Sequence, residues 1–318
     1  YGQTGPYSSR PGFASVCEAF GGFRYVTAVP AGEGEGEKRN PVFVRPNLSL
    51  GDTLCSLNAV FGTLLALIAR GRLGKGGDAH EKGIGQTVDA SIVESVMGVL
   101  ESVIPEADWK GVNREPAGST ITGIVPSNVY PCREGGFIII GANSAKLFKK
   151  LMTVIGRDDL GSDVSLENNA RRVERQEEID TAIGKWTQTK DPSEVQEIMD
   201  KTQIPCGQIY SAKQILSDEH FQSRGCFEEV PLPEGAGAPK RKAESGEETE
   251  RGKGGAHAET STLKIPSIAP ILSRTPGKTH WPGPPLGAHT KDVLLHVCGL
   301  SLKEIGDLEA SQVVLVSK

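Results

Sequence analysis

The sequence predicts an α/β protein rich in turns. Of its 318 residues, 37% are hydrophobic and 24% are charged, with 39 glycines and 20 prolines, which is typical of a soluble folded chain and not of a disordered one. Segments with the apolar spacing of helices alternate with short apolar runs typical of strands, and this alternation favours layered α/β architecture. The length suits one large or two smaller domains, so the chain can bury a core.

The strongest helical pattern runs from Thr53 to about Arg72. Because Ala and Gly fill the faces between the large apolar side chains, we expect this helix to be buried nearly all round. The apolar side chains at helical spacing are Leu54, Leu57, Val60, Phe61, Leu64, Leu65 and Ile68. Residues 86–89 are strand-like, and a second helix is predicted from Ser91 to about Val103, ending before a proline.

The middle of the chain combines a short strand with helices. Residues 136–140 are apolar and β-branched, which predicts a strand, and 144–155 have helical spacing. Asp191, with proline after it and Glu194 three residues on, is typical of a helix start with a capping box. Residues 204–210 are expected to be extended and to lead into a further helix.

Two segments lack the apolar content needed to pack. Residues 32–39 are glycine-rich and charged, which indicates a surface loop. Residues 233–262 have low complexity and are predicted to form a disordered insert. The basic triplet at 240–242 lies among acidic residues, which favours a solvated loop over a nuclear address. After the insert, helices are predicted to begin at Thr290 and, with a capping box, at Ser301.

Charge, hydropathy and metal-binding residue types exclude several classes of protein. A net charge of -5 and a pI near 5.8 give no basic surface for nucleic acid. The six histidines never pair at ligand spacing, so no metal is expected. No segment is expected to reach the apolar length of a membrane span. The cysteines have no CxxC spacing and are predicted to be reduced thiols. They are Cys17, Cys55, Cys132, Cys206, Cys226 and Cys298.

Asp52 is the candidate catalytic residue. It follows Gly51 directly before the long predicted helix, where a carboxylate ordinarily acts as an N-cap that accepts backbone amides. The same carboxylate, held at the positive end of a helix, would be ionised and oriented, and could serve as a nucleophile that forms an acyl-enzyme anhydride. Spacing alone favours the N-cap, and both interpretations stay open at this point.

The sequence resembles the class III (CaiB/BaiF-type) CoA-transferases over the whole chain except the two inserts. Short segments occur in the order of that family. They are Gly-Gln-Thr-Gly-Pro-Tyr at 2–7, Arg-Pro-Gly-Phe at 10–13, Phe-Gly-Gly at 20–22, Gly-Asp at 51–52, Gly-Gln-Thr-Val-Asp at 85–89, Ile-Val-Pro at 124–126, Ile-Pro-Cys-Gly at 204–207 and Pro-Leu-Gly-Ala-His-Thr at 285–290. Residues 118–126 and 204–221 are most similar to the succinyl-CoA:glutarate group, and formyl-CoA transferases are more distant.

This resemblance implies an incomplete doubly wound CoA-binding domain and a smaller α+β domain. The large domain would include residues 1–110 and, after the insert at 233–262, a return segment at 263–318; the small domain would be 111–232. The family's first strands precede the position of Tyr1, so the chain is expected to start inside a domain, and any targeting segment would lie before it. The full-length protein is implied to be an interlocked homodimer, and the glutarate group favours a mitochondrial over a cytoplasmic location.

The resemblance also implies a mechanism. Asp52 would attack the thioester of an acyl-CoA such as succinyl-CoA, giving a mixed anhydride and then a β-aspartyl-CoA thioester, which a small carboxylic or dicarboxylic acid takes up. Coenzyme A is a substrate here, and no cofactor is expected. The anhydride must be shielded from water.

Two further groups of site residues follow from the resemblance. Arg10, Pro11, Gly12 and Phe13 correspond to a CoA-contacting stretch, with a solvated loop as the alternative. A second group falls where the family has a glycine-rich cover over the substrate: Gly118, Thr120, Thr122 and Gly123. Because this loop carries only two glycines, an ordinary turn is an equal alternative.

Two other functions are compatible with parts of the pattern. Related 2-methylacyl-CoA racemases have a His followed by an Asp where this chain has Phe13 and Ala14. A racemase needs a second proton-transfer group, so Phe13 argues against racemisation. A non-catalytic truncated fragment is the alternative of another class.

Overall fold

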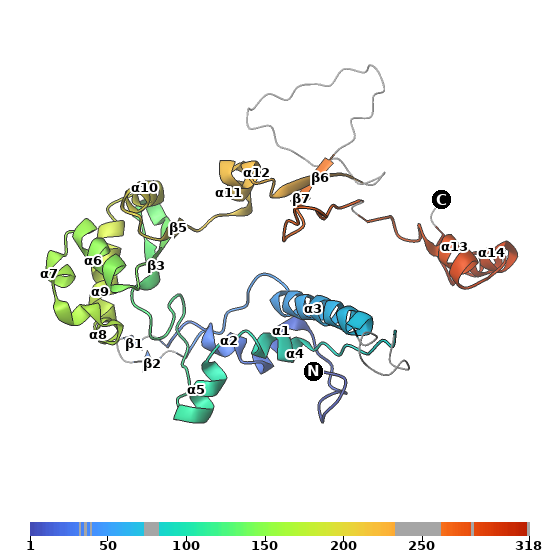
Figure 1. Ribbon diagram of the computed structural model, residues 1–318, viewed down its shortest axis with the longest axis horizontal. Coiled ribbons are helices and arrows are strands. Elements are labelled where there is room, and N and C mark those ends of the chain that lie inside the picture. Colours follow the sequence, from blue (N-terminus) through green and yellow to red (C-terminus); the bar gives the residue numbers. More distant parts are fainter. Residues whose placement is uncertain are drawn as a thin grey trace, which may run out of the picture. The chain divides into compact units, whose positions relative to one another are not determined.

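The computed structural model describes residues 1–31, 33–34, 37–38, 40–72, 83–232, 262–280 and 283–316. It forms two compact units, Tyr1–Ile209 and Tyr210–Lys318 (Figure 1). The disordered insert predicted at 233–262 lies outside the described residues except for Thr262, and half of the loop predicted at 32–39 also lies outside them. The domain boundaries predicted from the sequence stay predictions.

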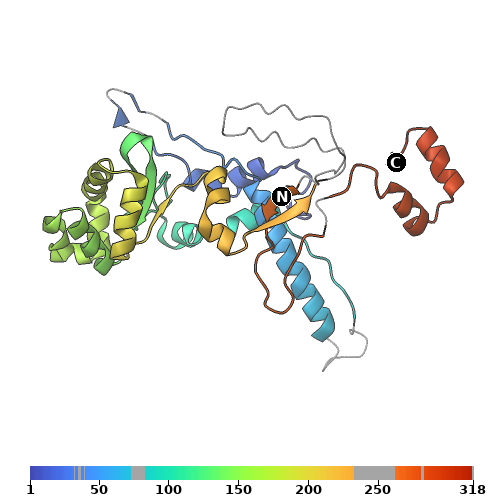
Figure 2. The ribbon, with the colours of Figure 1, turned by 90° about the horizontal axis from the view of Figure 1, so that it is seen from above.

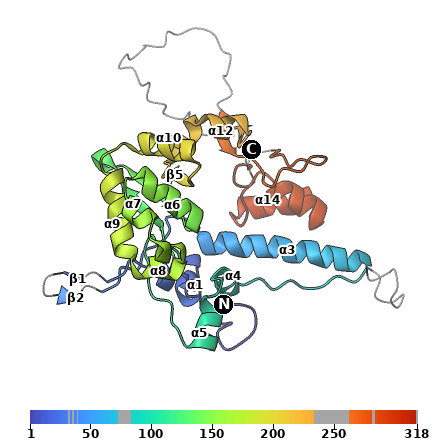
Figure 3. The same cartoon turned by 60° about the vertical axis from the view of Figure 1, so that its left-hand side comes forward.

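The N-terminal part of the first unit is helical. Its helices are α1 (Ala14–Phe20), α2 (Phe23–Val26), α3 (Leu50–Arg72), α4 (Ile92–Met97) and α5 (Val103–Lys110), with a short antiparallel pair β1 (Glu33–Gly34) and β2 (Glu37–Lys38) between α2 and α3. α1 contacts α2, α3 and α4, and α3 contacts α4. Figure 3 shows α4 beside the first part of α3.

Two predictions in this part are wrong. Residues 86–89 pair with no strand; a Cβ on Gly62 of α3 would lie 2.7 Å from Val88 Cγ1, so this extended segment packs against the helix backbone instead. The single helix predicted from Ser91 to Val103 is divided into α4 and α5. Pro105 lies in the first turn of α5, where its missing amide breaks no intrahelical hydrogen bond.

The rest of the first unit is a small antiparallel sheet with helices on one face. Its strands are β3 (Ser127–Pro131), β4 (Phe137–Gly141) and β5 (Cys206–Gln208), in the order β3-β4-β5. Its helices are α6 (Ala145–Val154), α7 (Asp158–Gly161), α8 (Asn169–Glu174), α9 (Gln176–Thr187) and α10 (Pro192–Thr202), with 3-10 turns η1 (Arg133–Gly135) and η2 (Val164–Glu167). β3 was not predicted; the β4 strand, the α6 helix and the extended β5 were.

Burial alternates along β4 and places the core of this part. Ile138 and Ile140 are fully buried, whereas Phe137 and Ile139 are exposed on the opposite face. The buried side packs with apolar residues of α6, α9 and α10. The capping box predicted at Asp191 is confirmed: the Asp191 amide donates to the Glu194 carboxylate at 2.8 Å.

The second unit contains a hairpin and short helices. They are α11 (Ala212–Ser217), α12 (Glu219–Ser223), the antiparallel pair β6 (Phe227–Pro231) and β7 (Thr262–Pro266), α13 (Thr290–Asp292), the π-helix η3 (Val293–Val297) and α14 (Leu302–Ala310). The predicted capping box is present before α14, where the amide of Ser301 donates to Glu304 at 2.8 Å.

The predicted α/β class is confirmed, since helices and sheets share the chain. Every strand pair among the described residues is antiparallel, so the parallel sheet implied by the resemblance is not represented in this part of the chain.

The burial predicted for the long helix is wrong. α3 forms as expected (Figure 2), but Phe61 is 64% and Leu65 65% exposed. The apolar pattern identifies side chains suited to burial, but burial also requires neighbouring elements. Among the described elements, chiefly α1 and α4 contact α3. By length and composition, Leu50–Gly71 is also apolar enough to cross a membrane, with a mean hydropathy of 1.6. The expectation that no segment reaches that length is therefore wrong, although core helices of soluble proteins have the same property.

Candidate active site around Asp52

Asp52 lies in the first turn of α3. The helix begins at Leu50, and the Thr53 amide donates to the Ser49 carbonyl at 3.1 Å, so Ser49 and not Asp52 occupies the N-cap position. The Asp52 carboxylate is exposed and has no hydrogen-bond partner among the described residues. It therefore lies near the positive end of a long helix, open to solvent.

A buried ion pair lies beneath this turn and was not predicted. Glu18 of α1 is fully buried; its Oε1 accepts the Gly51 amide at 3.0 Å, and its Oε2 accepts Arg24 Nε and Nη2 at 3.1 and 3.0 Å. The signal in the sequence was slight: one acidic residue in the short, largely apolar run 14–20. Sequence spacing could not show that it faces a turn 33 residues away.

Cys17 and Cys55 lie close to the same turn. Burial raises the pKa of the Cys17 thiol, and the charge of Asp52 raises it further. Cys55 Sγ donates to the Ala90 carbonyl at 3.3 Å and so ties α3 to the segment that leads into α4.

The predicted CoA-contacting stretch runs over the start of α1. The Arg10 guanidinium stacks on the Tyr7 ring at 3.5 Å from its centre. Pro11 is exposed, and Phe13 is 80% exposed. A Cβ on Gly12 would lie 3.1 Å from Cys17 Sγ, so this stretch packs against α1.

The predicted substrate loop is held at both ends. Gly118 and Gly123 have φ of +63° and +82°, a region that favours glycine. The Gly118 amide donates to the Ala28 carbonyl at 2.9 Å, and Thr120 Oγ1 donates within the loop to Ala117 at 2.8 Å, while Thr122 is exposed. Gly118, Thr120 and Thr122 also line a 390 Å³ pocket together with residues of α2 and of the segment before α5.

Two asparagine side chains tie this loop to the sheet and helices of the small antiparallel layer. Ser119 Oγ donates to Asn128 Oδ1 at 2.7 Å. Asn169 Nδ2 donates to the Gly123 carbonyl at 2.6 Å, and its Oδ1 accepts the Val125 amide at 3.2 Å. Both asparagines were missed, because the residues that they hold lie 9 and 46 positions away in the sequence.

The structure shows no single cluster of the predicted residues. Asp52 lies at the start of α3 and residues 10–13 lead into α1, and these two helices contact one another. The loop 118–123 is attached to the segment after α2, to β3 and to α8. No hydrogen bond among the described residues joins the loop to Asp52. Nor does any cluster of three His, Cys, Asp or Glu side chains in the described ranges have the arrangement of a metal site.

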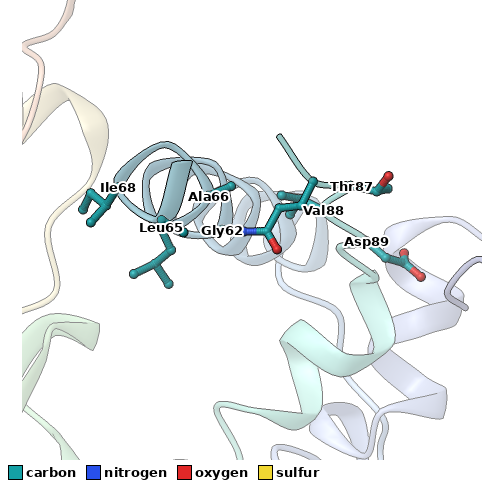
Figure 4. A pocket seen from close by; sticks show the side chains of 9 residues that line it. Gly62, Leu65, Ala66, Ile68, Thr87, Val88 and Asp89 are labelled. Atoms are coloured by element: carbon teal, nitrogen blue, oxygen red, sulfur yellow. The ribbon is translucent and has the colours of Figure 1, made fainter. Parts of the chain in front are cut away.

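An open groove lies further along α3 (Figure 4). It has a volume of 660 Å³ and is formed by one face of α3, with Gly62 and Leu65, and by the extended residues 86–89. Asp89 Oδ2 also accepts the Gln3 amide at 3.2 Å. Gly62 lies ten residues after Asp52, which is about 15 Å along a helix, so the groove is separate from the Asp52 turn.

Comparisons with known proteins assign the chain to a family. Residues 1–290 match the model of CoA-transferase family III. The succinyl-CoA–D-citramalate CoA-transferase of Chloroflexus aurantiacus is 34% identical over 99% of this chain and 67% of its own length. The succinate–glutarate CoA-transferase of Agrobacterium fabrum is 22% identical over 92% of this chain and 62% of its length.

Solved structures show the same fold. A CaiB/BaiF family protein from Brucella suis has a TM-score of 0.55 at 23% identity, covering 72% of this chain and 55% of that one. A Mycobacterium tuberculosis protein has a TM-score of 0.64 at 18% identity, covering 93% and 66%. The chain spans 60% to 68% of the length of four Chloroflexus relatives. Since the family model and these relatives align along nearly all of it, the chain belongs to CoA-transferase family III.

Proposed function

We propose that the full-length protein transfers coenzyme A from succinyl-CoA to a small dicarboxylic acid, with Asp52 as the nucleophile. The observation that carries this proposal is the Asp52 carboxylate itself, which is exposed in the first turn of a long helix and has no hydrogen-bond partner in the part of the chain that the structure describes. An ionised carboxylate in that position is available for attack. Membership of CoA-transferase family III implies that the group attacked by Asp52 is the thioester of an acyl-CoA.

The transfer would proceed through four balanced steps. An Asp52 oxygen attacks the thioester carbon, the C–S bond breaks, and CoA leaves as the thiolate. The thiolate then attacks the Asp52 carbonyl of the mixed anhydride and releases the donor acid, leaving an aspartyl-CoA thioester. An acceptor carboxylate attacks this thioester, and CoA leaves again. Attack of CoA on the acceptor acyl carbon regenerates the Asp52 carboxylate.

The relatives favour hydroxy-dicarboxylic acceptors. The names of relatives at 34% and 28% identity give succinyl-CoA with D-citramalate or L-malate as their substrates, whereas the glutarate enzyme is 22% identical. All of these acceptors carry two carboxylates, so one can attack while the other is bound. Racemisation has no support in the structure, because Phe13 provides no group that can move a proton.

Mass spectrometry of the full-length protein tests the nucleophile. Incubation with succinyl-CoA followed by hydroxylamine should convert the acylated side chain to a hydroxamate at Asp52. The Asp52→Asn variant should show no hydroxamate and no transfer. A wild-type protein that turns over without any modification at Asp52 would refute this role.

A panel of acceptors tests the substrate class. Citramalate, malate, succinate, glutarate, oxalate and formate should each be assayed with succinyl-CoA, with the highest kcat/KM expected for the hydroxy-dicarboxylates. Deuterium exchange at the α-carbon of an acyl-CoA without acid exchange would favour the racemase instead.

Homodimer formation is part of the same proposal, and sedimentation of the full-length protein tests it.

A further inference from the structure

We propose that Glu18 is a positioning residue for Asp52. Its buried carboxylate holds the amide of Gly51 and thereby fixes the backbone from which Asp52 projects. This inference rests on the proposed role of Asp52 as the nucleophile, and it adds a residue of another helix to that site.

Both carboxylate oxygens of Glu18 are engaged, and they face different elements. Oε1 accepts the Gly51 amide at the start of α3, and Oε2 accepts the paired donors of Arg24. The Glu18 side chain is fully buried and that of Arg24 is 16% exposed. Water therefore does not compete for the contact between α1 and α3.

The charge of Glu18 suits both of its partners. The first amides of a helix have no intrahelical acceptor, and a carboxylate is favoured at this positive end. Arg24 supplies the opposite charge that a buried carboxylate requires. A neutral apolar side chain at position 18 would leave both the Gly51 amide and the Arg24 guanidinium without an acceptor.

Close packing makes this contact specific for the Asp52 turn. A Cβ on Gly51 would lie 2.9 Å from Ile92 Cγ2 and 3.3 Å from Glu18 Cγ, so the turn rests directly on α4 and on Glu18. The Asp52 carboxylate has no hydrogen-bond partner among the described residues, so the backbone of this turn sets where it projects. Ser56 and Thr53 donate to carbonyls of this turn from within α3, whereas Glu18 accepts the Gly51 amide from another helix.

The experiment compares Glu18→Gln and Glu18→Ala with wild-type full-length protein. The matched control is Glu106→Gln on α5, which also removes a carboxylate that accepts two hydrogen bonds from an arginine, here Arg114 at 3.2 and 2.7 Å. Three quantities are measured for each protein: the single-turnover rate of hydroxamate formation at Asp52, the KM for succinyl-CoA, and the melting temperature.

A displaced nucleophile loses rate more than affinity. Glu18→Ala should lower the single-turnover rate by up to about 100-fold, the cost of a misplacement of about 1 Å, with KM little changed. Glu18→Gln keeps one acceptor oxygen and should be slowed less, whereas Glu106→Gln should react at the wild-type rate. If Glu18→Ala does not fold, Glu18→Gln decides.

Two outcomes would overturn the inference. One is a Glu18→Gln variant in which Asp52 is modified as fast as in wild type. The other is a Glu18→Gln variant whose losses of rate and of melting temperature both equal those of Glu106→Gln. That result would show that the ion pair of Glu18 acts on stability alone. Failure of the proposed function is separate, because the wild-type protein itself would then form no hydroxamate at Asp52.

Discussion

At the scale of single residues, Arg172 is an unusual charge because no carboxylate of the described residues forms an ion pair with it. It is fully buried in α8, and burial lowers the pKa of its guanidinium. Its donors are satisfied by oxygens from three segments. These are the carbonyls of Val125, Leu166, Glu167 and Asn143 and the side chain of Asn169. Arg172 therefore supplies hydrogen-bond donors to carbonyls in two irregular segments and in the 3-10 turn η2.

Replacing Arg172 by methionine should lower the free energy of unfolding by roughly 3 to 5 kcal/mol, because several buried carbonyls lose their donors. Urea denaturation of the two proteins measures this. The control is Arg171→Ala, whose ion pair with Glu174 joins side chains that are 61% and 59% exposed and should cost at most about 1 kcal/mol. Equal losses for the two variants would contradict the role of Arg172.

The raised pKa of the Cys206 thiol can be tested by its reactivity. Burial, with a smaller effect of Asp200, raises the pKa of its thiol to about 12. The folded pKa exceeds the unfolded value of about 8.5, so this group's contribution to stability is complete below that pH and is lost as the pH rises towards 12. At neutral pH, iodoacetamide should modify the exposed Cys298 well before Cys206. Rapid modification of Cys206 in the folded protein would contradict this.

At the scale of elements, the hydrogen bond between α8 and the end of the loop 118–123 can be removed by a single substitution. Asn169→Ala removes the donor to the Gly123 carbonyl, so a loop that excludes water should close less well. The ratio of succinyl-CoA hydrolysis to transfer should rise by up to about tenfold, the effect of one lost hydrogen bond of about 1.4 kcal/mol. Chromatography of free CoA and acceptor acyl-CoA gives the ratio.

The neighbouring residue offers a control for this prediction. Asn168 caps α8 by accepting the Ala170 amide at 2.9 Å, so Asn168→Ala should cost about 1 kcal/mol of stability without changing the ratio of hydrolysis to transfer. A loop without a covering role would give the same ratio for both variants.

Elements with local signals could be predicted from the sequence, and those that depend on distant partners could not. The capping boxes at Asp191 and Ser301 and the β4 run lie within a few residues, and all three predictions are confirmed. The strand predicted at 86–89 failed because strand pairing needs a partner and this segment met α3. At the candidate site, Asp52 was found through the order of the motifs, whereas Glu18 and Asn169 act across 33 and 46 positions.

At the scale of the whole molecule, α3 exposes a long apolar surface among the described residues. Its exposed apolar side chains run along most of the helix, and surfaces of this kind mark contacts with other protein. Residues 1–318 expressed alone should therefore self-associate with rising concentration, as sedimentation would show. Leu64→Lys together with Leu65→Lys should reduce the association. A stable monomer with transferase activity would contradict this prediction and the truncated-fragment alternative alike.

The hydrogen bond between the Val125 amide and Asn169 Oδ1 also gives the molecule an internal reporter. Exchange of that amide hydrogen with deuterated solvent requires this hydrogen bond to open, and its acceptor is a side chain of α8. Its protection factor should fall in Asn169→Ala and stay near the wild-type value in Asn168→Ala. The rate at one backbone position thus measures how often the contact between Asn169 of α8 and the segment after the loop opens, with no substrate present.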